Sequence, residues 1–330
     1  MRVAGLDLGT NTFLCLIADV DPATGAMHVI QDDVRIVRLG QGVNATKELH
    51  PEALARAEEA FAEFQKFIHA AKCEQVLAVA TSATRDAKNG HLLVEMGKRY
   101  GIPIEVISGE KEAELTFQGS IEPSWAGLTA VIDVGGGSSE IIFGDRNGIL
   151  IRFSANVGSV RLTEKYITGH PIAERELLAV TENVRQEIAL GMKAALSEFN
   201  NRHLSSGGAA PEAPLDLEGL LGRTTNAVAV AGTPTTLAAV QQGQAFVPEN
   251  IHGHVIAIDE LHKMIADLAS MTVAQRGLLA GMEPKRADVI VAGAICLCEA
   301  ARLLRTSAVQ VSIRGVRYGV AMWCSQRITQ

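Results

Sequence analysis

Residues 131–140 read VIDVGGGSSE, and residues 7–12 repeat the pattern in shorter form as DLGTNT. In each stretch an aspartate stands near the end of an apolar run, a turn of glycine and hydroxyl residues follows, and a second apolar run begins. This pattern predicts a buried strand, a turn and another strand. Because it recurs in both halves of the chain, we expect two lobes of related construction that face one cleft.

The remaining sequence alternates between strand and helix patterns, which indicates an α/β fold with layered domains. We expect the first lobe to span 1–120 and the second 121–305, with 306–330 returning to the first. A stretch near 205–214 is rich in serine, glycine, alanine and proline, which predicts a mobile loop. Periodicity predicts helices over 51–72, 86–100, 110–119, 172–199, 259–270, 286–304 and from about Val316.

Composition excludes several classes of protein. The chain has 330 residues, 47% of them hydrophobic, and a formal net charge of -7. A nucleic-acid-binding protein would normally carry a basic stripe, so the charge argues against that class. No window reaches the apolar length of a membrane span, and the five cysteines form no disulfide or zinc pattern. We therefore expect a cytoplasmic protein that binds neither nucleic acid nor a membrane.

The two glycine-rich turns are candidate phosphate sites. Successive backbone N–H groups in such turns can point at an anion, and the nearby hydroxyls add donors. Asp7 and Asp133 stand near the strand ends and could hold Mg²⁺ directly or through water. Strand alternation could bring Glu140 back toward the pocket of Asp133. The alternatives are ordinary hairpin turns and, for Asp133 and Glu140, a cross-strand polar pair.

A third turn, AGTPTT at 231–236, ends a strand and opens a helix. Gly232 and Thr233 would then stand at a helix N-terminus, which favours anions. Simple capping is the alternative, with Thr233 as the cap and Pro234 at the first helical position.

Charged residues follow two other strands. Arg85, in ATSATRDA at 80–87, is expected at the carboxyl end of a strand, where an arginine can clamp phosphate. The alternative is a salt bridge to Asp86 or another neighbour. Ser108 would cap a helix whose first turn holds Glu110, Glu112 and Glu114. Three carboxylates exceed what capping needs, but spacing alone does not distinguish among them, and a solvated helix start is the alternative.

The blocks at 7–13, 80–90, 107–113, 131–140 and 231–237 together resemble the exopolyphosphatase and guanosine pentaphosphate phosphohydrolase (Ppx/GppA) family. That family belongs to the actin, sugar kinase and Hsp70 superfamily. The resemblance covers nearly the whole chain. It implies two ribonuclease H-like lobes with a cleft between them, in the short two-domain form that lacks an extra C-terminal helical domain.

The resemblance also implies a reaction and a set of site residues. The expected activity is release of terminal orthophosphate from inorganic polyphosphate, with Mg²⁺ as cofactor and Mn²⁺ as a substitute. Glu112 would be the base that activates water, assisted by Arg85. The metal ligands would be Asp133 and Glu140, with Asp7 a further candidate. The expected phosphate-binding residues are Gly9, Thr10, Asn11, Thr12, Gly135, Gly136, Gly137, Ser138, Ser139, Gly232 and Thr233.

Other functions stay open at this stage. They are hydrolysis of guanosine pentaphosphate, non-catalytic sensing of guanosine polyphosphates, and a kinase of the same superfamily, although no acceptor pocket is recognisable. Near the C-terminus the family often reads VSDxGLREG, whereas residues 311–319 read VSIRGVRYG. Ile313, Arg314 and Tyr318 therefore leave substrate preference open. Two lobes without a third domain favour short polyphosphate and distributive release. We expect a homodimer, which could instead align a basic channel from Lys285, Arg286, Arg314 and Arg317.

Overall fold

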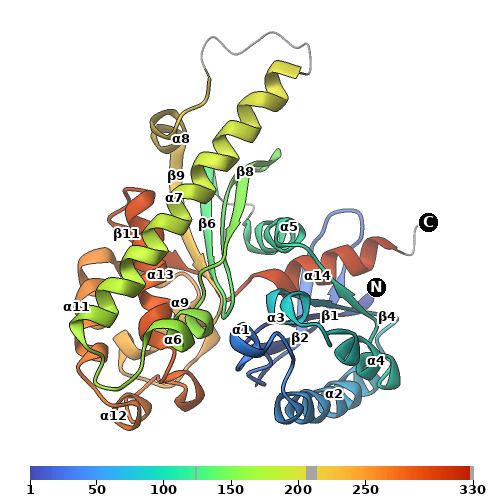
Figure 1. Cartoon of the computed structure of the whole chain (residues 1–330). Helices are drawn as coiled ribbons and strands as arrows, with labels where there is room; N and C mark the ends of the chain where they lie inside the picture. The colour runs from blue at the N-terminus through green and yellow to red at the C-terminus, as the bar shows by residue number, and fades with distance from the viewer. Residues whose placement is uncertain (123–124, 206–213, 328–330) are drawn as a thin grey trace. The chain divides into compact units, whose positions relative to one another are not determined.

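The computed structural model describes residues 1–122, 125–205 and 214–327. The chain forms two compact units (Figure 1). The first comprises Met1–Ser120, Gly135–Gly137 and the segment from Arg314 onward, and the second comprises Ile121–Val134 and Ser138–Ile313.

The first unit is built on a five-stranded mixed sheet in the order β3-β2-β1-β4-β5. Hairpins join the first three strands, which are antiparallel, while β4 and β5 run parallel to β1. Its strands are β1 (Arg2–Leu8), β2 (Thr12–Val20), β3 (Met27–Ile36), β4 (Gln75–Ala80) and β5 (Ile104–Val106).

Helices cover both faces of this first sheet. One apolar cluster joins the sheet to α2 (Pro51–Ala71) and α4 (His91–Arg99), and another joins it to α5 (Gly109–Ser120) and α14 (Val316–Gln326). In Figure 1, α5 and α14 lie above the sheet and α2 lies below it. Two short helices, α1 (Val43–Thr46) and α3 (Ser82–Asp86), lie in the connections.

Glycine lets α14 approach its neighbours backbone to backbone. A Cβ on Gly5 of β1 would lie 2.6 Å from the Ala321 nitrogen, and one on Gly319 would lie 2.0 Å from the Leu115 oxygen of α5. Neither contact leaves room for a side chain. The backbone of α5 is therefore fixed directly against α14.

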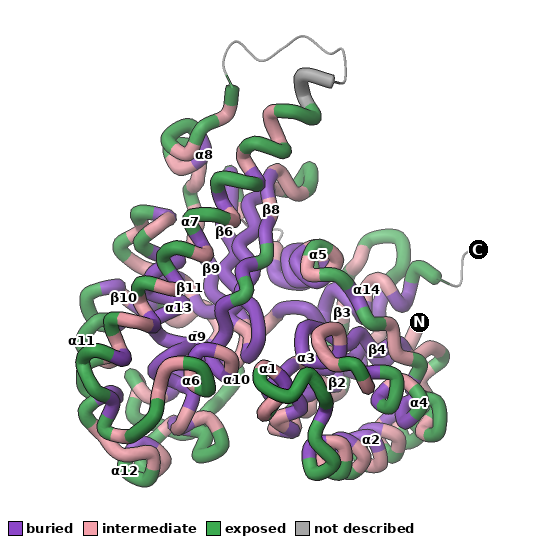
Figure 2. The backbone as a smooth tube through the Cα atoms, in the orientation of Figure 1, coloured by how far each residue is buried: buried purple, intermediate pink, exposed green. Residues whose placement is uncertain are grey.

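The second unit repeats the strand order of the first. Its six-stranded sheet runs β10-β11-β9-β6-β7-β8. Read from β8 back to β11, its strands correspond in order to those of the first sheet, and β10 is added at the edge. The strands are β6 (Leu128–Val134), β7 (Ser139–Asp145), β8 (Gly148–Ala155), β9 (Thr224–Val230), β10 (Val255–Ala257) and β11 (Ala308–Val311). Strand β6 is buried along its whole length (Figure 2). The prediction of two α/β lobes of related construction is confirmed.

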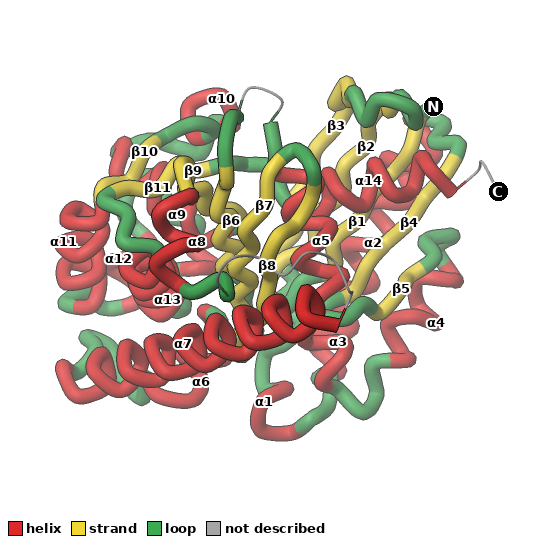
Figure 3. The backbone as a smooth tube through the Cα atoms, turned by 90° about the horizontal axis from the view of Figure 1, so that it is seen from above, coloured by secondary structure: helices red, strands yellow, loops and turns green. Residues whose placement is uncertain are grey.

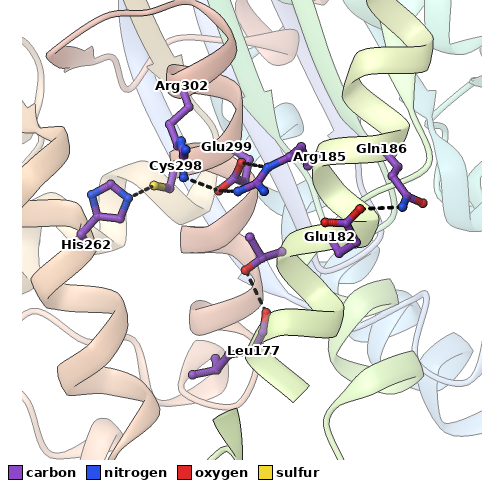
Figure 4. A network of polar contacts seen from close by, with 9 residues as sticks. Leu177, Glu182, Arg185, Gln186, His262, Cys298, Glu299 and Arg302 are labelled. Atoms are coloured by element: carbon purple, nitrogen blue, oxygen red, sulfur yellow. Dashed lines mark hydrogen bonds and ion pairs between the residues drawn. The ribbon is translucent and has the colours of Figure 1, made fainter. Parts of the chain in front are cut away.

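Long helices flank the second sheet, and α7 runs beside its strands (Figure 3). Arg185 of α7 donates to Glu299 of α13 at 3.0 Å, which links these two helices of the second unit (Figure 4). Cys296 and Cys298 are buried on α13. The helices are α6 (Ser159–Tyr166), α7 (Glu174–Ser205), α8 (Leu217–Arg223), α9 (Gly232–Gln242), α10 (Pro248–Ile251), α11 (Ile258–Ala269), α12 (Val273–Gly277) and α13 (Ile290–Leu303), with a 3₁₀ turn at Pro284–Arg286.

Several predicted boundaries are wrong. The helix expected over 86–100 begins only at His91, because α3 ends at Asp86, the chain is extended at Ala87 and Gly90 packs against the Thr84 oxygen. The helix expected over 286–304 begins only at Ile290. The return to the first unit begins at Arg314 rather than at 306, because β11 pairs with β9 of the second sheet.

Two further predictions concern the loop near 205–214 and membrane spans. Residues 206–213 of the predicted mobile loop lie outside the described residues. Among the residues that are described, no helix is long and apolar enough to span a membrane.

Candidate functional site

The first glycine turn joins β1 to β2 and is closed by a bond from the Gly9 N–H to the Thr12 oxygen at 3.0 Å. The loop after β3 is hydrogen-bonded to this turn. The N–H groups of Val37 and Arg38 both donate to the backbone oxygen of Asn11. The side-chain amide of Asn11 is 6% exposed, and neither its nitrogen nor its oxygen has a hydrogen-bond partner among the described residues. A buried amide of this kind suits a bound polar ligand.

Glu112 is set apart from its two acidic neighbours by burial. It lies in the first turn of α5, where its N–H donates to the Ser108 oxygen at 2.9 Å, and it is 7% exposed. Glu110 is exposed, and Glu114 pairs with Lys111 at 3.0 Å. The predicted cap is also present, because the Ser108 hydroxyl accepts from the Lys111 N–H.

Arg85 lies beside Glu112. Its Nη1 is 3.6 Å from Glu112 Oε2 and donates to the Ile107 oxygen at 2.8 Å. The contact with Glu112 accounts for the position of Arg85 without the salt bridge to Asp86 that was the alternative. One face of the first unit therefore presents a buried carboxylate and a guanidinium held together between α3 and α5.

The second glycine turn, Gly135–Gly137, connects β6 to β7 and belongs to the first unit by its contacts. The serines that follow it are both buried. Ser139 donates its hydroxyl to the Val157 oxygen at 2.7 Å, which occupies that donor within the protein. The turn thus offers backbone groups and Ser138 to an anion more readily than Ser139.

Asp133 and Glu140 stand directly opposite one another on the antiparallel strands β6 and β7. Directly opposed residues project from the same face of a sheet with Cβ atoms about 5 Å apart. Both are buried, at 6% and 1% exposed, and Glu140 Oε1 accepts from the Ser154 hydroxyl at 2.7 Å. The cross-strand alternative is therefore correct as geometry, and it also places two carboxylates side by side.

The third turn opens α9 at Gly232, as predicted, but the capping interpretation is wrong. The cap position is Ala231, which has a positive φ of 78°, and Pro234 is the third helical residue. Thr233 is buried against Gly293 of α13. Arg286 lies against Gly232, where a Cβ would meet its guanidinium at 1.7 Å. Burial lowers the pKa of that guanidinium to about 10.

A profile of the Ppx/GppA phosphatase family matches residues 16–326 of this chain. The chain belongs to the Ppx/GppA phosphatase family. It is 37% identical to exopolyphosphatase 2 of Mycobacterium tuberculosis, over 97% of this chain and 98% of that protein. Among solved structures, an exopolyphosphatase-like protein has a TM-score of 0.86 at 27% identity, with 100% and 99% of the two chains covered. An exopolyphosphatase from Cytophaga hutchinsonii has a TM-score of 0.79 at 26% identity, with 97% and 96% covered.

Within this Ppx/GppA phosphatase, the buried carboxylates that could hold a metal form a pair. No group of three or more His, Cys, Asp or Glu side chains in the described ranges could hold a metal ion. Magnesium does not require one, because it is commonly bound through one or two carboxylates, waters and substrate phosphates. The opposed carboxylates of Asp133 and Glu140 fit that mode.

Sequence reasoning missed the ion pair behind the first turn of this phosphatase. Arg317 of α14 forms a two-pronged bond with Asp32 of β3, both at 2.7 Å, and the Tyr318 hydroxyl lies 3.4 Å from the same carboxylate. Burial lowers the pKa of Arg317, while Asp32 and, more weakly, Tyr318 and Asp7 raise it. The pKa is raised overall. Arg317 is therefore engaged inside the first unit and does not line a surface channel.

Proposed function

We propose that this chain is an exopolyphosphatase, which hydrolyses the terminal phosphoanhydride bond of inorganic polyphosphate and releases orthophosphate. Family membership and the 37% identity to a mycobacterial exopolyphosphatase support the activity. The observation that carries the mechanism is the buried Glu112 carboxylate beside Arg85.

In the proposed reaction Glu112 accepts a proton from the water that attacks the terminal phosphorus in line. Arg85 and the N–H groups of the turns at Gly9–Thr12 and Gly135–Gly137 stabilise charge on the transferring phosphoryl group. Asn11 adds the donor of its buried side-chain amide. The leaving group is the polyphosphate shortened by one unit.

Asp133 and Glu140 are the proposed ligands of Mg²⁺, with Mn²⁺ as a substitute. When bound, the ion would neutralise charge on phosphate oxygens. Asp7, near the end of β1, is a further candidate ligand. We also propose that the chain forms a homodimer. We place it in the cytoplasm, a compartment that keeps thiols reduced, which agrees with its five free cysteines.

The test measures phosphate release from tripolyphosphate, long-chain polyphosphate and guanosine pentaphosphate with Mg²⁺ present. The proposal expects the two polyphosphates to be the better substrates by kcat/KM. Higher kcat/KM on guanosine pentaphosphate would move the assignment to that substrate. Binding of any of the three without turnover would identify a sensor.

A further inference from the structure

Ser82 has no role in the reaction described above, yet it touches both glycine turns. It is the first residue of α3, directly after β4, and it is buried. Its Oγ lies 2.8 Å from Thr10 Oγ1, in a hydrogen bond that either hydroxyl can donate. A hydroxyl at the β4–α3 junction is thus fixed to the first turn.

Gly137 of the second turn packs against the same two hydroxyls. A Cβ on Gly137 would lie 2.4 Å from Ser82 Oγ and 3.0 Å from Thr10 Oγ1. The φ of Gly137 lies outside the left-handed region, so the absence of a side chain reflects space rather than backbone conformation. Gly136 differs, because its Cβ would meet Thr10 Cβ and Cγ2 at 3.0 Å.

We propose that Ser82 is a positioning residue that sets the spacing between the turns at Gly9–Thr12 and Gly135–Gly137. The inference rests on the proposed function, since the spacing matters to catalysis only if both turns hold phosphoryl oxygens. Ser82 itself does not touch the substrate and acts through Thr10 and Gly137. A displacement of about 1 Å at a reacting group can cost roughly 10²-fold in rate, so the effect falls on kcat.

The test uses compensation between two substitutions. Ser82→Ala removes one hydrogen bond and should lower kcat roughly 3- to 10-fold, with KM changed less than about twofold. Gly137→Ala forces its Cβ onto Ser82 Oγ and should lower kcat by roughly 10²-fold. In the double variant the atoms nearest to the new Cβ at position 137 are Thr10 Oγ1 at 3.0 Å and the Cβ at position 82 at 3.2 Å. The double variant should therefore regain about tenfold over Gly137→Ala.

Gly136→Ala is the matched control, because its Cβ meets Thr10 and Ser82→Ala should not rescue it. The unfolding temperature gives a reading that does not depend on activity. Gly137→Ala should lower it, and Ser82→Ala should restore part of the loss. A double variant no better than Gly137→Ala in kcat overturns the proposal, even if the unfolding temperature recovers. If the wild-type chain releases no phosphate, the proposed function fails. Recovery of the unfolding temperature in the double variant would still show that the Ser82 hydroxyl limits the space beside Gly137.

Discussion

Glu112→Gln is the most direct perturbation of the proposed site. The substitution keeps the size of the side chain and the bond from its N–H to the Ser108 oxygen, but it removes the carboxylate that accepts the proton. Loss of a general base typically costs 10²–10⁴-fold. We expect kcat for tripolyphosphate to fall at least about 100-fold, which is about 2.7 kcal/mol of barrier.

Substrate binding and folding should survive this change. Arg85 keeps its bond to the Ile107 oxygen, and Gln presents an amide at the same place, so the unfolding temperature should stay within about 3 °C. Calorimetric titration with tripolyphosphate should give a Kd within about threefold of wild type. A loss of kcat together with binding would point to misfolding or a lost ligand rather than to a lost base.

Glu110→Gln and Glu114→Gln are the matched controls, since they remove neighbouring carboxylates from the same helical turn. Glu110 is exposed and Glu114 forms a partly exposed pair with Lys111, so each should change kcat less than about threefold. If Glu112→Gln keeps a third or more of wild-type kcat, the assignment of Glu112 as the base is refuted.

Three other outcomes are expected. EDTA should abolish phosphate release and Mg²⁺ or Mn²⁺ should restore it, whereas full activity in chelator would rule out the metal role of Asp133 and Glu140. Gly319→Ala forces a Cβ onto the Leu115 oxygen and should lower the free energy of unfolding in urea by about 3 kcal/mol, while Gly222→Ala, which meets nothing within 4 Å, should not lower it. On gels, long-chain polyphosphate should shorten as a whole population; full-length chains persisting beside free phosphate would instead show processive release.

The sequence predicted the two turns and the strands beside them because their signals are local. Apolar runs of strand length end at glycine-rich turns in both copies, and the recurrence of that pattern implied the repeated construction. Helix limits were less well predicted. The start of α13 at Ile290 was missed because residues 286–289 contain no glycine or proline that would mark a boundary, and α6 (Ser159–Tyr166) was not predicted at all.

The site could be predicted only in part, because burial and long-range pairing are tertiary properties. Spacing could not separate Glu112 from Glu110, whereas the structure buries one and exposes the other. Asp32 and Arg317 are 285 residues apart, and no local pattern connects them. Ser82 lies inside a block that the sequence did single out, but its contact with Thr10 depends on the parallel pairing of β1 and β4.

The two copies of the repeated motif have diverged in the charge that surrounds their aspartates. Asp7 stands on β1 under the influence of the Arg317 guanidinium, which is itself held by Asp32. Asp133 instead stands opposite a second buried carboxylate, Glu140. Like charges placed directly opposite on a sheet are destabilising, and burial increases their cost, so a bound cation would stabilise the second arrangement more than the first. The same strand order thus yields one aspartate near the Asp32–Arg317 ion pair and another that faces a second carboxylate.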